Sequence, residues 1–128
     1  MVNLIPLTDN FTIYQLSDNQ KIPSQIIASG FYSITKTSDE VSIVTNCNII
    51  FEDLKSSRDW KGFKVEGILD LSLVGIINYI TKPLKDNNIS VFIVSTFNTD
   101  YLFVKSESFN RAIEIFRRTE NLNIRDKK

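Results

Sequence analysis

An apolar stripe of helical period runs through residues 69–88. Its members are spaced i, i+3, i+4, i+7 and i+11: Leu73, Ile76, Ile77, Ile80 and Leu84. This spacing predicts an amphipathic helix, and either Asp70 or Ser72 would serve as its N-cap. We expect Pro83 to kink or restart the helix, because proline removes a backbone donor and crowds the preceding turn.

Runs with the character of strands lie on both sides of this helix. GFKVEGI (62–68) precedes it and ISVFIVSTF (89–97) follows it, and both are rich in β-branched and aromatic residues. Because the second run is apolar on both faces, we expect it to be a central strand. YLFVK would return as a hairpin strand, SESFNRAIEIFRR would form a second helix with Ser106 as its N-cap, and NLNI would form a short last strand. The resulting order, βαββαβ, is that of the ferredoxin-like fold.

The first half of the chain repeats this order in a shorter form. FTIYQL predicts a strand, residues 23–28 predict a short crossover helix, and FYSITKT and VSIVT predict a hairpin. A shift of 61 residues lays TKTSDEVSIV over TFNTDYLFVK, so that Thr35 meets Thr96 and Asp39 meets Asp100. The run NCNIIFEDLKSSRDW takes the place of the second helix. Such a repeat indicates an internal duplication.

The pattern as a whole predicts an α+β protein built from two ferredoxin-like (βαββαβ) halves. The division falls between residues 1–60 and residues 61–128, and the first half has a shortened crossover helix. Trp60 would anchor the two halves to each other, since tryptophan usually buries most of its ring.

Composition narrows the classes of function. The 128 residues carry 15 basic and 15 acidic side chains, which argues against nucleic-acid binding, because phosphates require an excess of positive charge. The chain has no histidine and one cysteine, Cys47, so a disulfide, a Ser-His-Asp triad and a His/Cys metal site are excluded. No apolar run approaches the ~20 residues of a membrane span, and the N-terminus does not have the pattern of a secretory signal. We therefore expect a cytoplasmic protein that is not an enzyme, uses no metal or cofactor, and contacts neither nucleic acid nor membranes.

Three motifs resemble those of the ACT-domain family: VEGILDLSLVGI, PLKDNNISVFIVST and TDYLFV. The upstream run GFYSITKTSDEVSIV is similar to the first half of the same pattern. More closely, the chain resembles small proteins of two ACT-like halves that are related to cytosolic arginine sensors and to the regulatory part of aspartate kinases. The resemblance implies a degenerate ACT-like half (1–60) and an ACT-like domain (61–128). It further implies a non-catalytic regulatory protein, a homodimer, that binds an amino acid or a similar small ligand where two ACT domains meet and acts on a regulated protein.

Two polar segments are candidates for the ligand site. The turn that enters the predicted helix would offer unpaired N–H groups and the positive end of the helix dipole to a carboxylate. The hairpin tip at residues 95–100 would offer hydroxyls, an amide and one carboxylate, which could hold an ammonium group. By resemblance, the helix entry and the facing strand end are where ACT ligands sit. The candidate ligand-binding residues are Asp70, Leu71, Ser72, Ser95, Thr96, Asn98, Thr99 and Asp100.

Other interpretations of the same residues stay open. Asp70 could be an N-cap, Asn98 and Asp100 could be ordinary turn residues, and Gly75 could mark close packing of the helix, which we favour, or leave room for a ligand. At the level of function, the apolar sheet face could bind a protein partner without any small ligand. An RNA-binding sheet has the same βαββαβ order, but this chain lacks the Lys/Arg-Gly-aromatic pattern of such sheets. An enzyme is a third alternative, for which the sequence offers no motif.

Overall fold

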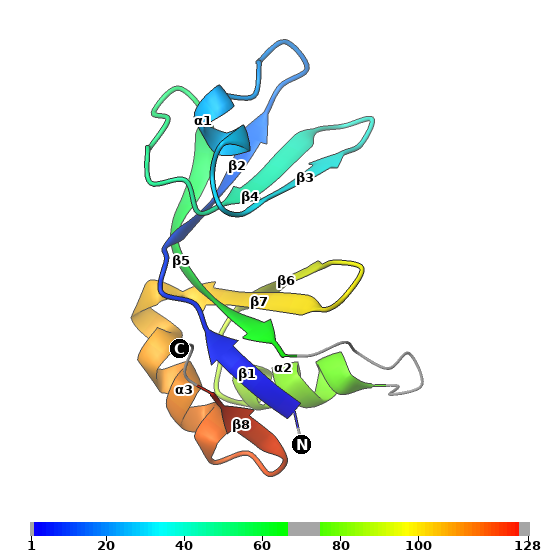
Figure 1. Ribbon diagram of the computed structural model, residues 1–128, viewed down its shortest axis with the longest axis vertical. Coiled ribbons are helices and arrows are strands. Elements are labelled where there is room, and N and C mark those ends of the chain that lie inside the picture. The colour runs from blue at the N-terminus through cyan, green and yellow to red at the C-terminus, as the bar shows by residue number, and fades with distance from the viewer. Residues whose placement is uncertain (1, 67–74, 126–128) are drawn as a thin grey trace. The chain divides into compact units, whose positions relative to one another are not determined.

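The computed structural model describes residues 2–66 and 75–125, shown as coloured ribbon in Figure 1. The chain divides into two compact units, which we call the N-terminal unit (residues 9–60) and the C-terminal unit (residues 1–8 together with 61–128). The first eight residues therefore pack with the second half of the chain, although the sequence pattern places them in the first half.

The N-terminal unit contains four paired strands and one short helix. The first four elements follow the sequence pattern: β2 (Phe11–Leu16), α1 (Ser24–Ile27), β3 (Tyr32–Lys36) and β4 (Val41–Thr45). The strands pair in the order β3-β4-β2-β5. Its core contains the buried side chains of Tyr14, Leu16, Ile26, Ile43 and Leu54.

The second helix predicted for the N-terminal unit is absent from the described residues, where β5 (Lys55–Val65) occupies the end of that run. The prediction was wrong because the helical stripe there is weak, and long-range pairing decides the structure. Ser57 lies opposite Ile13, and Lys55 lies opposite Gln15, in an antiparallel ladder with β2. Such pairing overrides weak local propensity.

The C-terminal unit is a five-stranded sheet with two helices. Its elements, besides the second part of β5, are β1 (Val2–Pro6), α2 (Ile76–Asp86), β6 (Val91–Ser95), β7 (Asp100–Lys105), the 3₁₀ turn η1 (Ser106–Ser108), α3 (Phe109–Arg117) and β8 (Leu122–Ile124). The pairing order is β6-β7-β5-β1-β8. The middle strand of this order is β5, and β6, which was predicted to be central, is an edge strand whose only strand partner among the described residues is β7. The apolar residues of β6 are only half-buried. A strand that is apolar on both faces therefore need not have a neighbouring strand on each side.

The N-terminal strand β1 completes the core of the C-terminal unit. It pairs antiparallel with β5 and parallel with β8, so it lies between two strands that are distant from it in sequence (Figure 1). Leu4 is fully buried in the cluster that also contains Phe63, Ile80 and Phe116. The sequence pattern did not predict this strand.

Both helices of the C-terminal unit begin later than predicted. The N-cap of α2 is Gly75, whereas the predicted caps, Asp70 and Ser72, lie outside the described residues. Gly75 is not a packing point within the described part of the chain, because a Cβ there would meet none of its atoms within 4 Å; its positive φ of 85° explains the glycine. The helix runs through Pro83 without a restart, and the N-cap position of α3 is Ser108 rather than Ser106, with no capping hydrogen bond from the Ser108 side chain.

Close packing occurs instead at Gly62 on β5. A Cβ at this position would lie 2.7 Å from the ring of Phe103, which is fully buried. The absent side chain thus leaves room for an aromatic ring on the neighbouring strand β7.

We predict that Leu4→Ala lowers the free energy of unfolding of the C-terminal unit by about 2–5 kcal/mol, the usual cost of a cavity at a fully buried leucine. Urea unfolding measures the effect, and Ile49→Ala is the control, because Ile49 is 46% exposed. A cost for Leu4→Ala no larger than that of the control would contradict the placement of β1 in the core.

Gly62→Ala should destabilise the protein by about 1–3 kcal/mol, because the new methyl group overpacks the ring of Phe103. In the double variant with Phe103→Leu, the smaller side chain should make the added cost of Gly62→Ala much smaller. If the alanine costs the same in both backgrounds, the close contact between Gly62 and Phe103 is not the cause.

Candidate functional site

A buried carboxylate lies at the end of the β6–β7 hairpin. Ser95 and Asp100 are directly opposite each other in the ladder, and the Ser95 hydroxyl donates a hydrogen bond of 2.5 Å to Oδ1 of Asp100. Asp100 is only 8% exposed, whereas Ser95 is exposed. Among the described residues, no basic side chain forms an ion pair with Asp100. The carboxylate is therefore held by a hydroxyl rather than by a cation.

Hydrogen bonds hold the turn between the two strands in a defined conformation. The backbone N–H of Thr96 donates to the carbonyl oxygen of Thr99 at 2.8 Å, and Oγ1 of Thr96 accepts from the N–H of Thr99 at 3.2 Å. The buried Thr99 hydroxyl donates to the carbonyl oxygen of Val65 at 2.5 Å. The hairpin end is thereby joined to the end of β5, one residue before the end of the described segment 2–66.

The structure brings together four of the eight candidate ligand-binding residues at this hairpin end: Ser95, Thr96, Thr99 and Asp100. Asn98 lies exposed on the same turn. Asp70, Leu71 and Ser72 lie outside the described residues, so their contribution to the site stays a prediction.

The hairpin of the N-terminal unit has the same turn. The N–H of Thr37 donates to the carbonyl oxygen of Glu40 at 2.9 Å, and Oγ1 of Thr37 accepts from the N–H of Glu40 at 3.2 Å. Thr37 is thus the counterpart of Thr96, a shift of 96 − 37 = 59 residues, and the predicted shift of 61 is wrong. In the correct register, Lys36 and Val41 stand where the C-terminal hairpin has Ser95 and Asp100. The N-terminal hairpin therefore lacks the hydroxyl–carboxylate pair.

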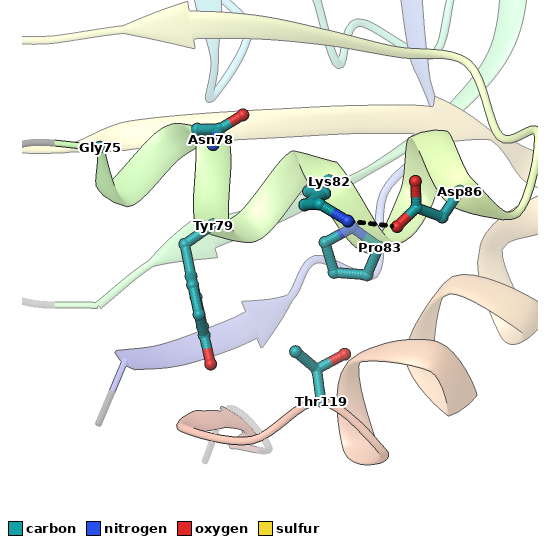
Figure 2. A pocket seen from close by; sticks show the side chains of 7 residues that line it. All are labelled: Gly75, Asn78, Tyr79, Lys82, Pro83, Asp86 and Thr119. Carbon is teal, nitrogen blue, oxygen red and sulfur yellow. Dashed lines mark hydrogen bonds and ion pairs between the residues drawn. The ribbon is translucent and has the colours of Figure 1, made fainter.

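A separate cavity of about 300 Å³ lies along α2, as Figure 2 shows. It is lined by Gly75, Asn78, Tyr79, Lys82, Pro83, Asp86 and Thr119. Its charged groups are already paired, because Nζ of Lys82 lies 2.8 Å from Oδ2 of Asp86, and the Tyr79 hydroxyl donates to the carbonyl oxygen of Glu120. None of the five candidate residues that the structure describes lines this cavity, which occupies the polar side of the helix that the apolar stripe does not mark.

Two further classes of site are not found within residues 2–66 and 75–125. No group of three or more His, Cys, Asp or Glu side chains there could hold a metal ion. The described helices include none that is long and apolar enough to cross a membrane.

Comparison with known families identifies the class of protein that this fold defines. The family model of the ACT domain matches residues 55–118, half of the chain. A second family model, described as an N-terminal domain, matches residues 9–53. The chain therefore belongs to the ACT-domain family. No curated protein matches the sequence.

Solved structures extend this result to nearly the whole chain. Protein Atu0741 from Agobacterium tumefaciens is 31% identical, with a TM-score of 0.89 over 99% of this chain and 94% of that one. The ligand-free regulatory subunit of aspartate kinase from Thermus thermophilus is 9% identical, with a TM-score of 0.63 over 94% and 97% of the two chains. Aspartate kinase from Clostridium acetobutylicum is 16% identical, with a TM-score of 0.63 over 89% of this chain and 34% of the enzyme. The mixed α+β fold is thus shared with the regulatory domains of aspartate kinases.

Ser95→Ala should lower the free energy of unfolding by about 1–3 kcal/mol, because the buried carboxylate of Asp100 loses its hydrogen-bond donor. The cost should be clearly smaller when Asp100 is already replaced by asparagine, and a double-mutant cycle in urea measures this coupling. Two substitutions whose costs add within about 0.5 kcal/mol would show that the pair does not act together.

Proposed function

We propose that this protein is a non-catalytic regulatory module that binds a small ligand, a free amino acid, in the C-terminal unit. The ligand lies between the hairpin end, which carries Ser95, Thr96, Asn98, Thr99 and Asp100, and the entry to α2. The second wall of this site consists of Asp70, Leu71 and Ser72. Membership of the ACT-domain family and the fold shared with regulatory domains of aspartate kinases support this proposal.

The main support for the proposal is the environment of the Asp100 side chain. Its carboxylate is buried, accepts one hydroxyl hydrogen bond, and has no ion-pair partner among the described residues. A buried charge is stable only when it is paired or well hydrogen-bonded, so a ligand ammonium group would add the missing charge. The ligand carboxylate would then bind the N–H groups at the helix entry.

We further propose that each unit derives from one ferredoxin-like half, the first of them a degenerate ACT-like half. The strand order β3-β4-β2-β5, with α1 after the first strand, supports this for the N-terminal unit, which lacks the second helix. In the C-terminal unit the order β6-β7-β5 and the positions of α2 and α3 support it, with β1 inserted between β5 and β8.

The position of β6 at the edge of the sheet supports a further proposal, a homodimer in which the ligand lies at an interface between ACT domains. No described strand pairs with its outer edge, and the strand VFIVS has no charged residue or proline to prevent pairing with another chain. Ser95 ends this strand, so a second copy on the edge would border the site. The alternative function is a protein–protein interaction module, in which the same edge binds a regulated protein and no small ligand takes part. In either case we expect a cytoplasmic protein that acts without nucleic acid, membranes or cofactors.

A thermal-shift panel of the twenty amino acids tests the proposal. A ligand at 100 times its dissociation constant adds about 2.7 kcal/mol of stability, which should raise Tm by roughly 8–14 °C. We expect one amino acid or a few related ones to produce this shift in the wild type and not in Asp100→Asn.

The matched control is Thr37→Ala, which removes the turn hydrogen bond of the other hairpin and should keep the full shift. A flat response of the wild type to the whole panel would favour the interaction module. A shift that persists in Asp100→Asn would show that the amino acid binds elsewhere.

A further inference from the structure

The N-terminal unit has a cavity of its own, of about 210 Å³, on the sheet face formed by β2, β4 and β5. In the ladder, Gln15 lies between Ser42 on one side and Lys55 on the other. Ile13, two residues away on the same face of β2, lies opposite Ser57. This face is opposite to the one whose side chains form the core of the unit, because side chains alternate along a strand.

Two opposite charges line this cavity without neutralising each other. Glu40 and Lys55 both contribute to its wall, yet neither takes part in an ion pair within the described segments of the chain. The cavity along α2 differs in this respect, because its lysine and aspartate are bonded to each other. The cavity of the N-terminal unit therefore presents one anionic group and one cationic group to whatever enters it.

Neighbouring side chains position hydrogen-bonding groups of the wall. Nε2 of Gln15 donates to Oε1 of Glu40 at 3.0 Å, which orients the carboxylate and leaves its second oxygen as an acceptor. Oγ of Ser57 accepts from Nε1 of Trp60 at 3.0 Å, so the Ser57 hydroxyl can direct its own hydrogen toward a ligand. Lys55 and Ser57 thus offer donors on one strand, while Glu40 offers an acceptor beside Gln15.

We infer that this cavity is a binding site for a small zwitterion. The anionic group of the ligand is bound by Lys55 and Ser57, its cationic nitrogen by Glu40, and its carbon atoms lie over Ile13. The volume restricts the ligand to a few carbon atoms, because typical ligand pockets occupy about 300–1,000 Å³. The site shares no residue with the proposed amino-acid site of the C-terminal unit, and it holds whether or not that proposal does.

Trp60 is the only tryptophan of the chain, and its indole N–H is bonded to the cavity wall. Its indole resonance in the ¹H–¹⁵N spectrum of the full-length protein therefore reports directly on the cavity. We would titrate it with the α-amino acids, with β-alanine and γ-aminobutyrate, and with acetate and methylammonium as ligands of single charge. The expected result is a saturable shift with at least one zwitterion and none with either single-charge ligand. Whether α- or ω-amino acids shift the resonance then shows which distance between the ammonium and carboxylate groups of the ligand the site accepts.

Glu40→Gln and Lys55→Met should each weaken this binding about tenfold or more, because a hydrogen bond to a charged group contributes about 1.5–3 kcal/mol. Lys36→Met and Asp39→Asn are the matched controls: both residues are exposed in the same unit, do not line the cavity, and should leave the titration unchanged. Asp100→Asn should also leave the titration unchanged, which separates this site from the proposed amino-acid site.

Three results would each overturn the inference: no zwitterion shifts the Trp60 resonance at millimolar concentration, both cavity variants bind as the wild type does, or Asp100→Asn abolishes the shift.

Discussion

Both units of this protein depend on the pairing of a single strand, β5. Its first part pairs with β2 and completes the N-terminal sheet, and its last part pairs with β1 and β7 in the C-terminal sheet. Within the β2–β5 ladder the register shifts at a bulge between Ser57 and Trp60, where Asp59 has a positive φ of 66°. The side chains follow this division, since Phe63 and Val65 are fully buried whereas Lys55 and Asp59 are exposed. One strand therefore takes part in the sheets of both units.

The end of β5 determines the position of the candidate site. Its Val65 carbonyl accepts the Thr99 hydroxyl, and this bond ties the β6–β7 hairpin to the end of the strand. The backbone bonds of the turn then bring Ser95 and Asp100 opposite each other. A defined turn and a buried carboxylate are a rigid arrangement, which suits selective binding because little side-chain freedom is lost when a ligand arrives.

Local pattern was enough to predict the elements whose partners are close in sequence, such as the β6–β7 and β3–β4 hairpins. It failed where pairing is long-range. The strand β1 pairs with residues near 65 and 122, and the first part of β5 was mistaken for a helix because its partner, β2, lies about forty residues away. The role of Gly75 was also predicted wrongly. A glycine can be required by a positive φ or by close packing, and the sequence alone does not distinguish these two causes. The polar hairpin tip was visible in the sequence, but the cavity between Glu40 and Lys55 depends on strand register and could not be found there.

The most direct test of this account is a crystal structure of the protein grown with a mixture of the twenty amino acids. We expect electron density for an α-amino acid at the hairpin end, with its ammonium nitrogen within hydrogen-bond distance of the Asp100 carboxylate and its carboxylate at the entry to α2. Density that shows only solvent there, or a protein side chain of the same or a second copy seated against Asp100, would contradict the claim that this hairpin end is a ligand site.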